Sequence, residues 1–347
     1  MKVSIVEDPK LPELNRAFDE KEMRGMLTAA LQRNTQTRIG EISRVRHEVL
    51  KYKPGKHCVI KYRLEWEGND STSTCLIGKL YRNNRGEHLF RKFQNLWNAS
   101  QDTQQQDNLF RMPFPIAYVS DLGMILQTEV SGLPLSSISP SEDWNGPVRS
   151  VGRNVAALHR LNVSTGEKKT MSDHIKKYCH PGPQVLIAEC PDLAHLVEPI
   201  LYGLETDTGL QNAPVYPVHG DLAPTQILIL DDHAFFVDLD GFCLSHPVLD
   251  IANFMTALTV HLGARSEGLK KTFIGTYLQF HSPEMLTGLR TYQAFIYLRR
   301  AMIRFRLKAT NDWRHQVRLL LKTGNEFLST PTELDAPSYS SLAQVTW

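Results

Sequence analysis

Residues 218–242 read VHGDLAPTQILILDDHAFFVDLDGF, and this stretch decides the fold that the rest of the chain can adopt. Within it, Asp221 directly follows Gly220, and Pro224 comes shortly after. Glycine and proline punctuate loops, and a loop residue can direct its side chain into a cleft because it is not committed to a strand ladder. We therefore expect the Asp221 carboxylate to face a ligand.

The second half of the stretch predicts a tight hairpin. Residues 227–230 form a short apolar run, residues 231–233 a polar turn, and residues 234–237 a return strand. The return strand ends at Asp238, so the hairpin would bring Asp238 to the same side as Gln226.

That arrangement places a carboxamide oxygen and a carboxylate oxygen within reach of one hard cation. Mg²⁺ favours a few protein oxygens, with phosphates and water completing its coordination. Asp221, one loop away, is placed to accept a proton from a substrate hydroxyl. The structural alternative is a buried hairpin with Asp221 capping a helix, and the number of spaced features that agree argues against it.

The spacing also matches a known catalytic loop. The interval of five residues from Asp221 to Gln226 is that between Asp and Asn in the protein-kinase motif H-R-D-x-x-x-x-N. Asp238 falls where the metal-binding Asp of the next kinase motif falls. The stretch resembles the aminoglycoside phosphotransferase and choline kinase branch of the kinase-like fold, with the pattern H-G-D-x-H-x-x-N followed by a hairpin and I-D-x. The residues that match it are His219, Gly220, Asp221 and Asp238.

This resemblance implies an α+β, two-lobed protein-kinase-like fold. Residues 1–130 would form a small antiparallel-sheet lobe that binds the nucleotide, and residues 131–347 a larger, mostly helical lobe. The implied cofactors are ATP or GTP and Mg²⁺.

Two positions depart from the family pattern. Gln226 stands where Asn is usual, and Ala223 stands where His is common. Gln carries the same amide oxygen on a stem one methylene longer, and maltokinase-like proteins look similar here. We therefore do not interpret the site as inactive.

Composition limits the classes of protein that remain. The chain has 347 residues, 41% hydrophobic and 22% charged, which is enough for two lobes with their own cores. A net charge of +2 is too small to indicate nucleic acid as the main partner. The five cysteines contain no C-x-x-C pair, which argues against a disulfide framework.

The chain shows no signal for export or membrane insertion. Its first residues, MKVSIVEDPKLPEL, lack the apolar segment of a secretory signal, and no run reaches the roughly 18 apolar residues of a membrane span. We expect a cytoplasmic protein that does not bind membranes. The sequence does not indicate an oligomeric state.

The region before residue 130 predicts a helix and an antiparallel meander. Residues 19–32 have apolar residues at helical spacing. Residues 43–52, 58–67 and 72–82 predict three strands, the second with clean alternation, and residues 53–56 form the first connecting turn.

The resemblance gives this meander its roles. In a kinase-like lobe the first turn covers the nucleotide phosphates and the third strand carries a phosphate-binding lysine. Lys79 is the basic residue inside that strand, and it shares a face with Ile77, which would cover the adenine. Lys56 in the turn would add charge near the phosphates. The structural alternative for Lys79 is a solvated strand face.

Glu87 is the only acid between Lys79 and Asp102, and it begins a helix predicted over residues 86–100. The resemblance assigns it as the ion-pair partner of Lys79. A simpler interpretation is an acid that complements the helix dipole in the first turn.

Two further strands, at residues 112–117 and 123–130, complete the first lobe. In the resembling family the second of these runs into the linker between the lobes. Thr128 and Val130 would then present backbone groups to the adenine edge.

Around the catalytic loop, residues 144–161 predict the helix that precedes it, in which His159 is expected to have a structural role. Residues 168–211 read as an insertion that is helical in pieces. Asp250 begins a helix and is expected to cap backbone N–H groups and brace the catalytic loop. For Asp240 we favour a capping role over a second metal site.

The last helical region, residues 291–328, is basic. Residues 241–330 contain twelve Lys or Arg against five acids, an excess of seven. Such charge would repel a polycationic aminoglycoside, which favours a neutral or anionic acceptor. The structural alternative is a solvated basic face.

The resulting prediction is an ATP-dependent phosphotransferase that acts on the hydroxyl of a small molecule such as a sugar, an amino alcohol or an antibiotic-like compound. One rival is a non-catalytic, pseudokinase-like nucleotide-binding module, motivated by Gln226, by Ala223 and by the single glycine in the turn at residues 53–56. A weaker rival is a glycosyltransferase that uses Asp238-Leu239-Asp240 as a D-x-D metal motif.

Overall fold

The computed structural model describes residues 7–34, 40–67, 69–83, 85–101, 110–163, 166–207 and 213–329. The chain divides into two compact units. Within the described residues, the first unit runs to Gln101 and from Met112 to Ser131, and the second comprises residues 110–111 and those from Gly132 onward.

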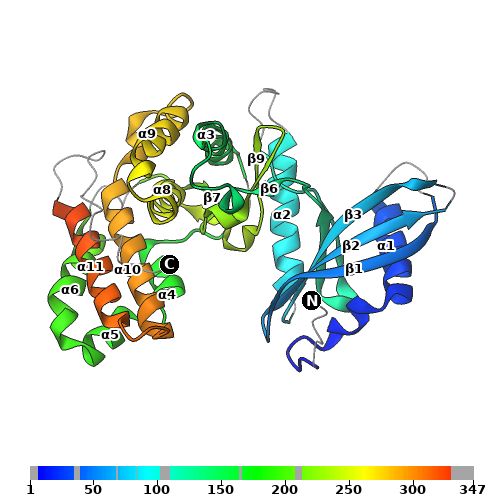
Figure 1. Cartoon of the computed structure of the whole chain (residues 1–347), viewed down its shortest axis with the longest axis horizontal. Coiled ribbons are helices and arrows are strands. Elements are labelled where there is room, and N and C mark those ends of the chain that lie inside the picture. Colours follow the sequence, from blue (N-terminus) through cyan, green and yellow to red (C-terminus); the bar gives the residue numbers. More distant parts are fainter. Residues whose placement is uncertain are drawn as a thin grey trace. The chain divides into compact units, whose positions relative to one another are not determined.

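The first unit is built on one antiparallel sheet with the strand order β1-β2-β3-β5-β4. The three predicted strands of the meander are present close to their expected bounds (Figure 1). The strands are β1 (Ile42–Lys53), β2 (His57–Trp66), β3 (Asn69–Tyr81), β4 (Pro115–Val119) and β5 (Met124–Thr128).

Strict alternation gives this sheet two different faces. In β2, Cys58, Ile60, Tyr62 and Leu64 are fully buried and join a core with apolar residues of α1 (Glu20–Asn34). The buried Tyr62 hydroxyl has a hydrogen-bond partner in that core, because it donates to the Ala17 carbonyl at 2.9 Å. The predicted amphipathic helix therefore covers this face of the sheet.

The other face carries Ile77, Lys79 and Tyr81, as the alternation in β3 predicts. The helix α2 (Arg85–Gln101) begins beside it, because a Cβ at Gly86 would lie 3.4 Å from the Tyr81 ring and 2.9 Å from the Gly123 carbonyl oxygen. Gly86 thus lets the start of α2 approach the sheet closely.

The second unit is mainly helical and carries two small sheets. One sheet has the order β6-β8-β9, and the other pairs β10 with β7. The strands are β6 (Leu133–Pro134), β7 (Tyr216–Val218), β8 (Ile227–Leu230), β9 (His233–Phe236) and β10 (Cys243–Ser245). The predicted hairpin is therefore present, with its turn one residue shorter than expected because His233 already pairs with Leu230.

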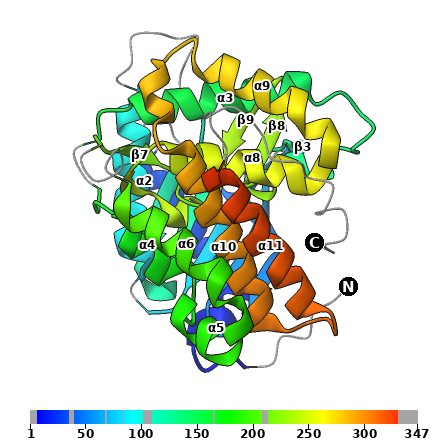
Figure 2. The ribbon, with the colours of Figure 1, turned by 90° about the vertical axis from the view of Figure 1, so that its left-hand side faces the viewer.

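The helices of this unit match most of the predicted helical regions. The insertion at 168–211 is helical in pieces, and α10 and α11 lie side by side (Figures 1 and 2). The helices are α3 (Asn145–Arg160), α4 (Met171–Tyr178), α5 (Pro183–Glu189), α6 (Ala194–Thr206), α8 (Val248–Leu262), α9 (Ser266–Tyr277), α10 (Leu289–Leu307) and α11 (Trp313–Ser329). The region 291–328 is thus two helices, because Lys308 ends α10 in the left-handed conformation (φ 45°).

Two buried histidines of this unit predict acid sensitivity. Burial lowers the pKa of both His174 and His246 to about 4, from an ordinary value of 6.5. The unfolded chain therefore binds more protons than the folded chain between these values, so stability falls as the pH falls through this window. From pH 7 to pH 5 we expect a loss of about 2 kcal/mol per ring in the free energy of unfolding.

Urea denaturation at the two pH values measures this loss. His174→Gln should reduce the difference between pH 7 and pH 5, whereas His195→Gln, at an exposed position, should not. Equal or greater stability of the natural protein at pH 5 would contradict the expectation.

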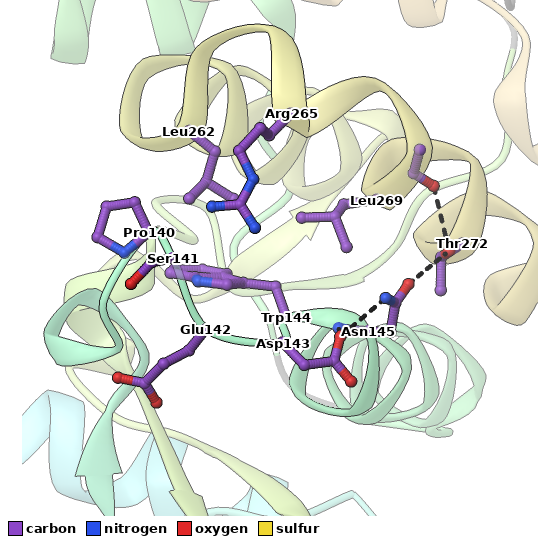
Figure 3. A pocket seen from close by; sticks show the side chains of 11 residues that line it. Pro140, Ser141, Glu142, Asp143, Trp144, Asn145, Leu262, Arg265, Leu269 and Thr272 are labelled. Atoms are coloured by element: carbon purple, nitrogen blue, oxygen red, sulfur yellow. Dashed lines mark hydrogen bonds between the residues drawn. The ribbon is translucent and has the colours of Figure 1, made fainter.

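A pocket of about 630 Å³ lies at the beginning of α3. Figure 3 shows it between the segment that precedes α3 and the segment from the end of α8 into α9. Its labelled lining residues include Asp143, Trp144, Asn145, Arg265 and Thr272. His159, whose ring approaches Asp250, is near the other end of α3, roughly 20 Å from this pocket at 1.5 Å per residue.

Among the described residues, no helix combines the length and the apolar character needed to cross a membrane. The predicted α+β division, a small antiparallel-sheet unit and a larger helical unit, is confirmed.

Candidate active site

The hairpin register brings Gln226 and Asp238 together. Ile227 pairs with Phe236, and the Val237 N–H donates to the Gln226 carbonyl at 2.9 Å. Asp238 follows immediately and takes the left-handed conformation (φ 60°), which turns the chain away from the strand. The two predicted metal ligands are therefore neighbours at one end of the hairpin.

The loop that contains Asp221 and the turn after Asp238 touch through their backbones. Gly220 has φ 80°, and a Cβ there would lie 2.5 Å from the Gly241 carbonyl oxygen. A Cβ at Gly241 would in turn lie 2.8 Å from the His219 carbonyl oxygen. Glycine at both positions is what allows the two loops to meet.

Gly220→Ala should therefore disrupt this contact. The left-handed conformation costs about 1 kcal/mol for alanine, and the clash with Gly241 adds to it, so we expect a total loss of about 3 kcal/mol. Gly123→Ala is the matched control, because Gly123 is left-handed (φ 62°, ψ 31°) and a Cβ there would meet no atom closer than 3.5 Å. Chemical denaturation compares the two variants, and equal losses would contradict the role given to the contact.

Asp250 braces the catalytic loop, as the sequence predicts. Its fully buried carboxylate accepts hydrogen bonds from the N–H groups of His219 (2.7 Å) and Gly220 (2.9 Å). His159 also approaches it, with Nε2 3.4 Å from the carboxylate and Nδ1 3.0 Å from the Tyr277 hydroxyl. The structural role expected for His159 is confirmed, since its ring links α3 to this brace.

His219 ties the loop to the hairpin. Its Nε2 lies 3.0 Å from the Val237 carbonyl oxygen, and its ring packs edge-on against Phe236. The loop is thus fixed by the buried Asp250 carboxylate on one side and by the hairpin at residues 227–236 on the other.

Asp221 is ion-paired with Arg299, a residue that the sequence analysis missed. Arg299 Nη2 donates to Asp221 Oδ1 at 2.5 Å, and Gln226 Nε2 lies 3.4 Å from Asp221 Oδ2. Arg299 comes from α10, 78 residues further along the chain. The only signal in the sequence was that it is one of several basic residues in the last helices.

Gln226 fits a divalent cation. Its side-chain amide nitrogen faces Asp221, so its Oε1 is directed elsewhere, and that oxygen is buried without a hydrogen-bond partner among the described residues. A buried polar atom without a partner calls for a ligand or water. In the described part of the chain, no group of three or more His, Cys, Asp or Glu side chains could hold a metal. An ion at Gln226 and Asp238 would therefore depend on phosphate and water for its other ligands, which suits Mg²⁺.

In the first unit, Lys79 lies on the predicted face of β3. Its Nζ is 5.0 Å from the centre of the Tyr81 ring. Glu87 forms an ion pair with Arg91 at 2.6 Å, one turn along α2. The assignment of Glu87 as the partner of Lys79, and of Ile77 to the adenine, stays a prediction.

The turn before β2 is hydrogen-bonded to the carboxylate of Asp8. Asp8 Oδ2 accepts hydrogen bonds from the Gly55 N–H at 2.7 Å and from the Tyr52 hydroxyl at 2.8 Å. The bond from Gly55 holds the pKa of Asp8 below its usual value. Lys56 is exposed in this turn, and its phosphate role stays a prediction.

The backbone N–H of Thr128, at the end of β5, is already used in a hydrogen bond. The Thr128 N–H donates to the Phe114 carbonyl at 3.0 Å, and the Glu129 carboxylate pairs with Lys61 at 2.6 Å. An adenine contact from Thr128 would have to use its carbonyl group, and the contact from Val130 stays a prediction.

Neither the known protein families nor the curated proteins contain a match to this sequence. Solved structures do resemble this fold. A choline/ethanolamine kinase family protein from Mesorhizobium loti has a TM-score of 0.57 at 15% identity, covering 90% of this chain and 95% of its own. The choline kinase from Cryptosporidium parvum has a TM-score of 0.58 at 11% identity, covering 88% and 95%. The macrolide 2'-phosphotransferase from Brachybacterium faecium has a TM-score of 0.53 at 14% identity, covering 86% and 98%.

These similarities extend over most of each chain, and the sequence identities are low. They show that the chain has the protein-kinase-like fold of choline/ethanolamine kinases and antibiotic phosphotransferases. The family resemblance carried by His219, Gly220, Asp221 and Asp238 is thus confirmed at the level of the fold.

Proposed function

We propose that this protein is an ATP-dependent phosphotransferase that moves the γ-phosphoryl group to a hydroxyl of a small molecule, with GTP as the other possible donor. The observation that carries the proposal is Gln226 Oε1, which is buried and has no hydrogen-bond partner among the described residues. Gln226 is a neighbour of Asp238 in the hairpin and of the braced loop that presents Asp221. The proposal favours a neutral or anionic acceptor over a polycationic one.

Three side chains of the loop and hairpin have roles in this proposal. Asp221 orients the acceptor hydroxyl and accepts its proton, while Gln226 and Asp238 hold the divalent cation. When bound, Mg²⁺ would neutralise charge on the phosphate oxygens. Because phosphoryl transfer depends mainly on positioning and charge neutralisation, this small set of side chains is sufficient.

The proposal assigns the nucleotide contacts to the first unit. Lys79, oriented by Glu87, would neutralise phosphate oxygens, and Lys56 would add charge at the turn before β2. Ile77 would cover the adenine, and backbone groups of Thr128 and Val130 would meet its edge.

One observation supports the non-catalytic alternative. The Gly55 N–H, which would face a phosphate, is already bonded to Asp8. A nucleotide-binding module without turnover would fit this occupied turn and the replacement of the usual His by Ala223. The kinase-like fold gives both the meander and His219-Gly220-Asp221 a place, which the glycosyltransferase alternative does not.

A thermal-shift panel tests the proposal. Nucleotides with Mg²⁺ are combined with sugars, amino alcohols and aminoglycosides, and each combination that stabilises the protein is then assayed for ADP or GDP formation. A ligand at a hundred times its dissociation constant stabilises by about 2.7 kcal/mol, which such a panel detects. Nucleotide binding with ADP formation would support the phosphotransferase. Binding without turnover for any acceptor would support the non-catalytic module.

A further inference from the structure

Three side chains hold the Arg299 guanidinium next to the Asp221 carboxylate. Nη2 donates to Asp221 at 2.5 Å, and Nη1 donates to Asn253 Oδ1 at 3.3 Å. The group lies over the Tyr178 ring, with Cζ 4.2 Å from the ring centre, and the Tyr178 hydroxyl donates to the Gly220 carbonyl at 2.7 Å. A stacked, hydrogen-bonded guanidinium of this kind has one fixed orientation.

This guanidinium remains accessible to a ligand. Its side chain keeps 16% of its surface exposed, and that of Asp221 keeps 38%. The two bonds described use two of its five N–H donors. A substrate that brings a hydroxyl to Asp221 therefore meets a cation a few ångströms away.

The helix that carries Arg299 adds no negative charge to this site. Arg299 offsets the charge of Asp221, and α10 carries five arginines and no acid. A cationic acceptor would face like charge in a partly buried site, where Coulomb interactions are stronger than in water. An oxyanion would instead gain charge-assisted and bidentate hydrogen bonds from the guanidinium.

We propose that Arg299 determines acceptor specificity, and that the acceptor is a hydroxylated anion whose carboxylate or phosphate binds Arg299 while its hydroxyl lies at Asp221. This inference rests on the proposed phosphotransferase function and deepens it. It narrows the acceptor class from neutral or anionic to anionic, and it names the side chain responsible.

The test uses acceptors of related structure that carry different charges. One series is 1,3-propanediol, 3-hydroxypropanoate and 3-aminopropan-1-ol, and the other is glucose, glucuronate, glucose 6-phosphate and glucosamine. Calorimetry with MgADP measures their binding without turnover. In at least one series the anion should bind about ten times more tightly than the cation, and comparison of glucuronate with glucose 6-phosphate separates carboxylate from phosphate.

Variants connect this preference to Arg299. Arg299→Gln should abolish the preference without changing MgATP affinity, a pattern that loss of folding would not produce. Arg299→Lys keeps the charge and should retain part of it, and Arg306→Gln, at an exposed position on the same helix, should retain all of it. Equal binding of anion and cation, binding of no acceptor, or an unchanged preference in Arg299→Gln would overturn the inference.

An assay of phosphoryl transfer from MgATP to the same acceptors separates this inference from the proposed function. An Arg299-dependent preference without phosphoryl transfer would refute the phosphotransferase and keep the anion site. Phosphoryl transfer without any charge preference would keep the phosphotransferase and refute the role of Arg299.

Discussion

Asp221→Asn should lower phosphoryl transfer by about a thousandfold, the range expected when a positioned general base is removed. The substitution keeps the size of the side chain and one oxygen for the bond to Arg299, but it removes the charge that accepts the hydroxyl proton. Nucleotide affinity should stay within a few-fold of the natural protein, because the proposed metal and phosphate contacts come from other residues.

ADP formation measures this effect, with the best acceptor from the panel. Asp232→Asn is the matched control: it removes one negative charge from the exposed turn of the neighbouring hairpin, where φ is 60° and Asn is well tolerated. Activity of Asp221→Asn within tenfold of the control would argue against any role of Asp221 in proton transfer.

Asp250→Ala should produce the largest loss of stability, about 3–5 kcal/mol. The substitution leaves the buried N–H groups of His219 and Gly220 without acceptors, and each such group costs about 1–3 kcal/mol. It also removes the carboxylate beside His159. The catalytic loop would lose its brace, so activity should fall in parallel.

Denaturation monitored by circular dichroism measures the loss. Thr256→Val on the same helix is the control: Thr256 is 1% exposed, and its hydroxyl has no hydrogen-bond partner among the described residues. Removing that hydroxyl at nearly constant volume should cost little. A comparable loss in both variants would show that the helix tolerates no substitution and that Asp250 has no special role.

Local patterns predicted the parts of the molecule that local physics decides. Alternation along β2 fixed which face of the sheet is buried, and the hairpin at 227–236 followed from one apolar run, a polar turn and a second apolar run. The brace at Asp250 was predicted from the family resemblance, since its partners His219 and Gly220 lie about 30 residues away and not in its own helix.

The missed features depend on contacts between distant segments. Arg299 is one of five arginines in α10, and nothing in the local sequence indicates which of them turns toward Asp221. Asp8 binds Gly55 across 47 residues and lies in a segment without a motif. The break at Lys308 was missed because no Gly or Pro marks it, although the residue takes a left-handed conformation.

The central claim is that Gln226 and Asp238 together bind a nucleotide-associated divalent cation, and calorimetric titration of ATP with and without Mg²⁺ tests it most directly. For the natural protein and for Asp232→Asn we predict that Mg²⁺ tightens ATP binding at least about tenfold, a difference of about 1.4 kcal/mol. Asp238→Asn and Gln226→Leu should lose that gain while their metal-free ATP affinity stays the same. An undiminished effect of Mg²⁺ in both variants would contradict the assignment of the site.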